Sequence, residues 1–139
     1  METLFSTANL LAMSGWVALL VAPRWRPANW WYAGLAIPAL LAVGYTALLA
    51  VHAPGASGGF SSLAGVARLF ETRGVLLAGW VHYLAFDLFL GAWMCRRGAA
   101  DGMNPWLLRL CLPPTFLAGP VGLLLFLALR AARLRGAWR

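Results

Sequence analysis

Residues 75–94 read VLLAGWVHYLAFDLFLGAWM, an apolar run long enough to cross a membrane as one helix. Two ionisable side chains, His82 and Asp87, lie inside this run. Ionisable groups are costly in hydrocarbon, so a residue of this kind is a functional candidate by default. The chain has only four acids, and the other three are placed where water can reach them. Asp87 is therefore the side chain that most needs an explanation.

The rest of the chain has the same membrane character. Of its 139 residues 62% are hydrophobic, which is too apolar for a soluble domain of this size. The apolar runs predict spans over about residues 5–22, 31–51, 75–94 and 105–129, with a short interfacial helix between the second and third spans. Because helices satisfy their own backbone groups in lipid, the predicted fold is all-α. It is a four-helix transmembrane bundle that forms one domain over residues 1–139.

All eleven basic residues are arginines, and they cluster at the ends of the apolar runs. This distribution suits contact with membrane lipids, and we expect no nucleic-acid partner. With four spans, six arginines would lie on the side of the termini and five on the other side, which leaves the orientation open. The all-arginine composition, rich in alanine, glycine and leucine, is typical of a GC-rich bacterial genome. We therefore expect a protein of the bacterial inner membrane, with its first apolar run retained as a span.

Prolines and glycines interrupt two of the predicted spans. Pro38 predicts a kink in the second span because proline removes one helical hydrogen bond. Pro113-Pro114 and the segment Gly119-Pro120-Val121-Gly122 interrupt the fourth span, and the glycines there could admit a second helix or open a pocket. Cys95 and Cys111 are expected to be free thiols, although a disulfide is possible on an oxidising face. Oligomerisation is also possible.

Helical spacing divides the polar residues of the third span between two faces. At 100° per residue Asp87 shares a stripe with Trp80 and Tyr83, and His82 lies about 140° away. The two ionisable groups would meet one ligand only if a cavity wraps around this span. Trp80 and Tyr83 could stack on a flat or polyene ligand and present N–H and O–H groups to it. Ordinary helix packing is the alternative role for each of these side chains.

Several other residues are candidates for the surroundings of Asp87. A buried carboxylate either gains a proton or finds a cation, and the candidate cations are Arg68, Arg73 and Arg109. Asn9 in the first span is a candidate hydrogen-bonding residue. The two histidines lie about 30 residues apart, which does not match the ligand spacing of zinc or iron. We therefore expect no metal and no cofactor.

Three groups of residues together resemble the abscisic-acid-deficient-4-like family. They are the pair of motifs Trp80-Val81-His82 and Asp87-Leu88-Phe89, Asn9 with Pro23 around the first span, and the turn Gly119-Pro120-Val121-Gly122. The resemblance covers nearly the whole chain. Plant members of the family are associated with neoxanthin synthesis, so the resemblance implies a lipophilic carotenoid or other isoprenoid as ligand.

The resemblance implies an isomerisation in which an epoxide end group of violaxanthin opens and a neighbouring carbon loses a proton. Such a reaction needs an acid and a base and no redox change. Asp87, kept neutral by burial, would be the acid and His82 the base. Arg73 or Arg109 would hold the developing alkoxide. No plastid transit sequence is expected in this chain, so the substrate could be a related carotenoid or another isoprenoid.

Two other classes of protein fit the same residues. A non-catalytic accessory subunit would use its buried polar residues only to lock helices together. A small proton-coupled transporter would use a membrane acid, but such transporters usually carry that acid in the first span. Retention of an isoprenoid by the purified protein separates the leading hypothesis from the accessory subunit, and a proton-dependent uptake assay in vesicles tests the transporter.

Overall fold

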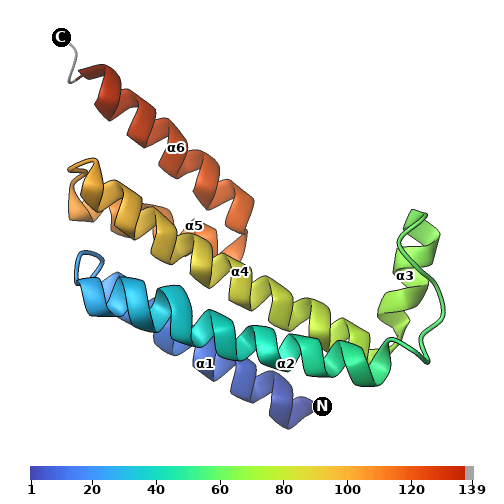
Figure 1. The fold of residues 1–139 in the computed structure, drawn as a ribbon. Helices are drawn as coiled ribbons and strands as arrows, with labels where there is room; N and C mark the ends of the chain where they lie inside the picture. Colours follow the sequence, from blue (N-terminus) through green and yellow to red (C-terminus); the bar gives the residue numbers. More distant parts are fainter. Residues whose placement is uncertain (137–139) are drawn as a thin grey trace.

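A computed structural model describes residues 1–136, and every regular element within them is a helix (Figure 1). The elements in chain order are α1 (Glu2–Val21), η1 (Pro27–Ala36), α2 (Ile37–His52), α3 (Leu63–Glu71), α4 (Arg73–Ala100), α5 (Pro105–Leu117) and α6 (Gly119–Gly136). The prediction of an all-helical fold is confirmed for this part of the chain.

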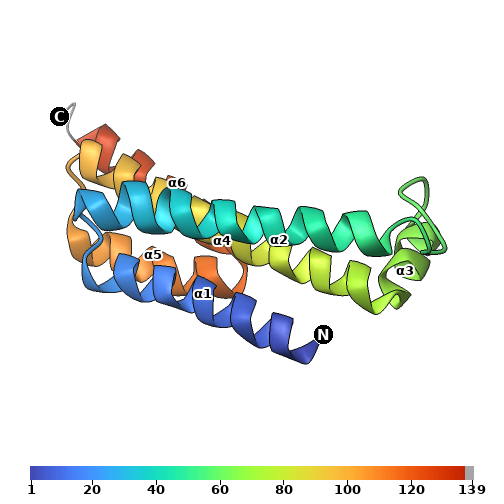
Figure 2. The same ribbon diagram turned by 60° about the horizontal axis from the view of Figure 1, so that its bottom comes forward.

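Three helical stretches within residues 1–136 are long and apolar enough to cross a membrane. They are α1, the continuous stretch Pro27–His52 formed by η1 and α2, and α4. They lie side by side, and α4 is the central helix because α1, η1, α2, α5 and α6 all pack against it (Figures 1 and 2). Trp16, Leu19, Leu84 and Leu88 belong to the buried core between these helices. Many large apolar side chains lie on the outside, as expected for a protein surrounded by lipid.

The second span begins with an unusually wide helical turn. η1 is a π-helix of ten residues, which continues directly into α2 at Ile37. Pro38 is the second residue of α2, directly after the change from π-helix to α-helix. A kink at this residue stays a prediction. Within η1 the buried Asn29 donates a side-chain hydrogen bond to the carbonyl oxygen of Pro23, which fixes the turn after α1.

The short helix predicted between the second and third spans is present as α3. Its N-cap is Ser62, whose hydroxyl accepts a hydrogen bond of 3.0 Å from the backbone N–H of Gly65. In the preceding loop Gly58 has φ of +106°, a conformation that L side chains rarely adopt. The helix projects from one end of the bundle (Figure 1). Its location in the membrane interface stays a prediction.

The predicted fourth span over residues 105–129 differs from the structure. α5 and α6 are two separate helices that fold back against each other as a hairpin, with the reversal at Ala118 (Figures 1 and 2). Close approach of the two helices explains why position 122 is a glycine, since a Cβ there would lie 2.5 Å from the Cα of Thr115. Arg130 on α6 pairs with Asp101 in the loop after α4, so α6 returns to the end from which α5 starts.

Candidate functional site

Asp87 lies halfway along α4, at the tip of the α5–α6 hairpin. It is the fifteenth of 28 residues in this helix and is only partly exposed. Its carboxylate faces the backbone N–H of Gly119, the first residue of α6. A helix N-terminus carries unpaired N–H groups and partial positive charge, so it stabilises a carboxylate at this place. Asp87 therefore anchors the hairpin tip to the middle of α4.

The hairpin tip has the residues that such a close contact requires. Position 119 has no room for a side chain, because a Cβ there would lie 2.9 Å from Cγ of Asp87 and 3.2 Å from its Oδ2. Pro120 follows in the first turn of α6, where proline is tolerated. From α4, the hydroxyl of Tyr83 donates a hydrogen bond of 2.9 Å to the carbonyl oxygen of Phe116 and lies beside the Asp87 carboxylate.

The predicted arginine partners do not pair with Asp87. Arg109 donates hydrogen bonds of 2.8 and 3.0 Å to the carbonyl oxygens of Leu20 and Val21, and its guanidinium stacks on Trp106. Arg73 is the first residue of α4, so it lies far from the hairpin tip, which meets the middle of this helix. Among residues 1–136 no salt bridge involves Asp87, and its Oδ2 is buried without a hydrogen-bond partner.

An aromatic stripe leads from Asp87 toward the N-terminal end of α4. The rings of Tyr83 and Trp80 are 5.3 Å apart, and the ring of Phe5 on α1 lies 5.7 Å from that of Trp80. The indole N–H of Trp80 donates a hydrogen bond of 3.0 Å to Oδ1 of Asn9. Four of the residues singled out in the sequence, Asn9, Trp80, Tyr83 and Asp87, therefore lie along one continuous path.

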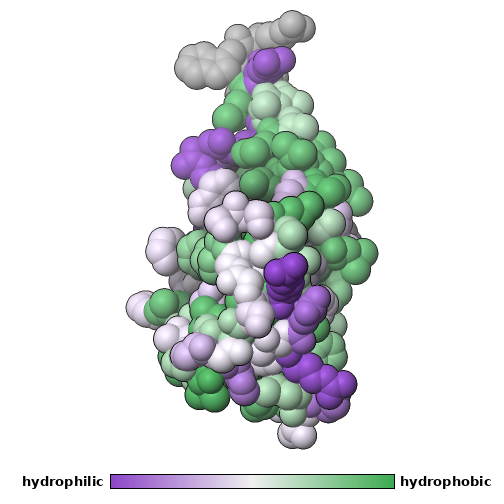
Figure 3. Space-filling model, turned by 90° about the vertical axis from the view of Figure 1, so that its right-hand side faces the viewer, coloured by the Kyte–Doolittle hydropathy of each residue, from purple (hydrophilic) through white to green (hydrophobic). Residues whose placement is uncertain are grey.

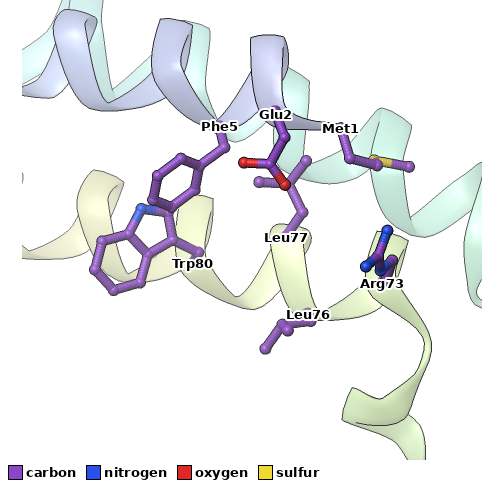
Figure 4. Close-up of a pocket in the computed structure, with 7 residues that line it drawn as sticks. All are labelled: Met1, Glu2, Phe5, Arg73, Leu76, Leu77 and Trp80. Carbon is purple, nitrogen blue, oxygen red and sulfur yellow. The ribbon is translucent and has the colours of Figure 1, made fainter.

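The stripe ends in a groove between α1 and α4, which we call the α1–α4 groove (Figure 4). Its volume is about 350 Å³, and it is lined by Met1, Glu2, Phe5, Arg73, Leu76, Leu77 and Trp80. Apolar and aromatic side chains form most of its surface, while Glu2 and Arg73 supply opposite charges. Such a lining fits a lipophilic molecule that carries a polar group. The hairpin stops at Asp87, so it does not cover this part of α4.

The sequence analysis missed the contribution of α1 to this groove. Glu2, Phe5 and Asn9 follow one another at spacings of three and four residues, which places them on one face of a helix. This periodicity was visible in the sequence. The sequence does not show which neighbour this face of α1 contacts, because the face could have turned toward lipid, α2 or α4.

His82 lies on another side of α4 and has different neighbours. Its ring stacks on that of Phe86 at 4.5 Å and lies 5.4 Å from that of Tyr45 on α2. With Tyr45 and Phe70 it lines a second groove, of about 380 Å³, near α3. Asp87 does not line this second groove. The structure thus keeps His82 and Asp87 apart, as the helical spacing predicted.

Cys95 and Cys111 are both free and buried. Within residues 1–136 no three histidine, cysteine, aspartate or glutamate side chains are grouped as a metal site would need. The chemistry available along the stripe is therefore that of a carboxylic acid, a phenol, an indole and an amide. Groups of these types are able to form hydrogen bonds with a ligand, and the carboxylic acid and the phenol are able to exchange protons with it.

The fold and the stripe fit a class of helical membrane protein, with three membrane-length helices and a hairpin that ends on a carboxylate in the middle of one of them. The chain belongs to the ABA DEFICIENT 4-like family, whose model matches residues 3–126. The match includes the stripe and the hairpin tip, and it confirms the resemblance inferred from the sequence. No curated protein and no solved structure gave a significant match to the chain.

Proposed function

We propose that the protein binds a carotenoid or another isoprenoid in the α1–α4 groove and along the aromatic stripe, so that the end group lies beside Asp87, about two helical turns beyond Trp80, and Asp87 is the acid that acts on it. The observation that carries this proposal is the carboxylate itself. It lies midway along a membrane-length helix with no arginine partner, at the end of an aromatic stripe that starts in a largely apolar groove. Membership of the ABA DEFICIENT 4-like family supports a ligand of this class.

The proposed reaction is the isomerisation of an epoxide end group. Protonated Asp87 gives its proton to the epoxide oxygen while the C–O bond breaks, so the oxygen becomes a hydroxyl. A base removes a proton from a neighbouring carbon, and the electron pair of that C–H bond forms the new double bond. Atoms and electrons balance without a redox partner. Apolar surroundings keep a carboxylic acid protonated, which this role for Asp87 requires.

The base is the less defined part of the proposal. His82 can take this role only with a ligand that reaches two faces of α4, because it and Asp87 have different neighbours. Once Asp87 has given up its proton, its carboxylate is itself a base, and it lies on the same face of α4 as the aromatic stripe. Comparing variants of the two residues decides between these possibilities. Arg73 lines the groove but lies about 21 Å along α4 from Asp87, too far to hold an oxyanion that forms beside that carboxylate, and Arg109 is engaged by α1.

The accessory-subunit hypothesis would be favoured by a tight ion pair at Asp87 and by the absence of free space nearby. Instead, Asp87 has no arginine partner and a groove lies further along its face of α4. Asp87 still has a structural role, because it caps α6. A test of function must therefore separate the cap from the acid.

Asp87→Asn makes that separation, because an amide oxygen still accepts from the N–H of Gly119 but the side chain cannot donate a carboxylic proton. We expect Asp87→Asn to fold and retain ligand but to lose turnover of violaxanthin or a simpler epoxy-isoprenoid, with products separated by chromatography. Loss of turnover in His82→Ala as well would assign the base to His82. Full activity in Asp87→Asn would exclude the acid role.

Ligand retention tests the location of the binding site. The wild-type protein, purified from a host that makes carotenoids, should carry a bound isoprenoid, and Trp80→Ala should carry less. Trp31→Ala is the matched control, because Trp31 is an exposed tryptophan outside the groove. Absence of any isoprenoid from the wild-type protein, or equal retention by both variants, would contradict the proposal.

A further inference from the structure

The arginines of the described chain gather at one end of the bundle. That end holds Arg24 and Arg26 after α1, Arg96 and Arg97 near the end of α4, Arg109 on α5, and Arg130, Arg133 and Arg135 on α6. Contacts join these segments, since Arg109 binds the carbonyl oxygens that end α1 and Arg130 pairs with Asp101 after α4. We call this the arginine end. Asp101 is its only acid within residues 1–136.

The opposite end has a balanced charge. It holds Arg68 and Arg73 together with Glu2 and Glu71. Figure 3 looks onto this end, where strongly hydrophilic side chains are scattered among pale and apolar ones. Eight arginines therefore face two across the bundle. The sequence prediction gave six against five, because it carried the arginines of α6 to the wrong end.

The predicted and observed arginine counts differ because the chain turns back at the hairpin tip. The first helix of the hairpin is too short to cross a membrane. α5 has 13 residues, or about 20 Å at 1.5 Å per residue, whereas the hydrocarbon core is about 30 Å thick. Its tip meets Asp87 halfway along α4, and α6 then runs back to the arginine end. The chain after α4 thus enters and leaves on the same side.

Exposed tryptophans accompany the arginines. Trp25 and Trp31 near the start of the second span and Trp106 at the start of α5 are between 62% and 73% exposed. Tryptophan is enriched at the boundary between lipid and water. Arg26 and Arg96 lie over the ring of a further exposed tryptophan, Trp30. The arginine end therefore has the side chains of a surface that contacts headgroups.

We propose that the arginine end lies among the anionic headgroups of the cytoplasmic leaflet and that α5–α6 is a re-entrant hairpin. Arginine is retained on the cytoplasmic side of membranes, and anionic lipids of that leaflet attract it. The N-terminus and the loop before α3 then lie on the opposite side, and α6 ends in the cytoplasm. This proposal does not depend on the ligand or on catalysis.

Single cysteines in the full-length protein test this topology. Ser57→Cys places a thiol in the loop before α3, and Ala132→Cys places one near the C-terminal end of α6. Both positions are exposed. Cys95 and Cys111 are buried, so the unmodified chain serves as the blank. Intact bacterial spheroplasts are treated with a membrane-impermeant maleimide, and a second sample is permeabilised first.

We expect Ser57→Cys to react in intact spheroplasts and Ala132→Cys to react only after permeabilisation. Reaction of both thiols in intact spheroplasts, or of neither, would mean that residues 105–129 cross the membrane, and would overturn the re-entrant hairpin. Reaction of Ala132→Cys alone in intact spheroplasts would overturn the orientation.

A charge-transfer variant tests whether the arginines set the orientation. It changes four exposed arginines to glutamine and adds three at exposed positions of the opposite end: Arg24→Gln, Arg26→Gln, Arg133→Gln, Arg135→Gln, Ala53→Arg, Ser61→Arg and Ala64→Arg. The arginine balance then changes from eight against two to four against five. We expect loss of part or all of the Ser57→Cys reaction in intact spheroplasts. A control with glutamine at the three added positions should react like the parent, and a parental pattern in the charge-transfer variant would overturn the role of the arginines.

Discussion

Gly119→Ala is the sharpest test of how the hairpin tip is joined to α4. The new methyl group would lie 2.9 Å from Cγ of Asp87, whereas carbon atoms pack best about 3.5–4.0 Å apart. The carboxylate must therefore move away and lose its place at the start of α6. Overpacking of this kind costs about 1–3 kcal/mol, and a displaced carboxylate at a helix N-terminus costs about 0.3–1 kcal/mol more.

The expected destabilisation of about 2 kcal/mol corresponds to a Tm lower by roughly 4–8 °C for a chain of this length. Tm is measured from tryptophan fluorescence in detergent. Gly44→Ala is the matched control, because a Cβ at that glycine of α2 meets nothing within 4 Å. An alanine there should be neutral or stabilising by up to about 1 kcal/mol, since glycine is a poor helix former.

A double-mutant cycle connects the effect to the carboxylate. In an Asp87→Ala background the space occupied by the carboxylate is free, so adding Gly119→Ala should cost less than about 0.5 kcal/mol. If the cost in that background stays near 2 kcal/mol, Asp87 is not what excludes a side chain at position 119, and our account of the hairpin tip is wrong.

Three further predictions concern other contacts. Trp80→Phe keeps the aromatic ring but leaves Asn9 without its N–H donor, so stability should fall by about 0.5–1.5 kcal/mol in the same Tm measurement. The hydrogen bond from Arg130 lowers the pKa of Asp101 below its usual value. The ionised Asp101 therefore contributes its full stabilisation above the unfolded-state pKa of about 4, and this stabilisation is lost as pH falls through the lower folded-state pKa. Asp101→Asn should therefore lower Tm at pH 7 and flatten its decline between about pH 4 and pH 2; an unchanged acid profile would refute this. Ser62→Ala should cost α3 about 1 kcal/mol, seen as faster amide hydrogen exchange confined to that helix.

Apolar runs made most of the fold predictable. The three long spans and the helix capped by Ser62 were all expected, with boundaries shifted by a few residues. A single helix over residues 105–129 was wrong, because a glycine and a proline in an apolar run permit either a kink or a reversal, and the structure has a reversal at Ala118. The contacts that decide between them join residues far apart, namely Gly122 with Thr115 and Arg130 with Asp101. No periodicity within one helix encodes such contacts.

The candidate site was predictable to a similar degree. Helical spacing placed Asp87 with Trp80 and Tyr83 and away from His82, and the structure has the same arrangement. The neighbour of Asp87 was not predictable, since a buried carboxylate predicts a cation or a proton as its partner. A backbone N–H at the start of a helix has no side-chain signature of its own, so Gly119 was expected only to admit a second helix or to open a pocket.

The half-length hairpin gives the two leaflets unequal access to the interior of the protein. The hairpin packs beside the C-terminal half of α4, while the N-terminal half leaves the groove near Trp80 uncovered. With the proposed orientation, a ligand would reach the groove by lateral diffusion within the outer monolayer and not from the aqueous phase. The supply of ligand would then depend on its partitioning into the membrane and on its flip-flop between the two monolayers. The rate of ligand binding should therefore follow the composition of the outer monolayer and not the solubility of the ligand in water.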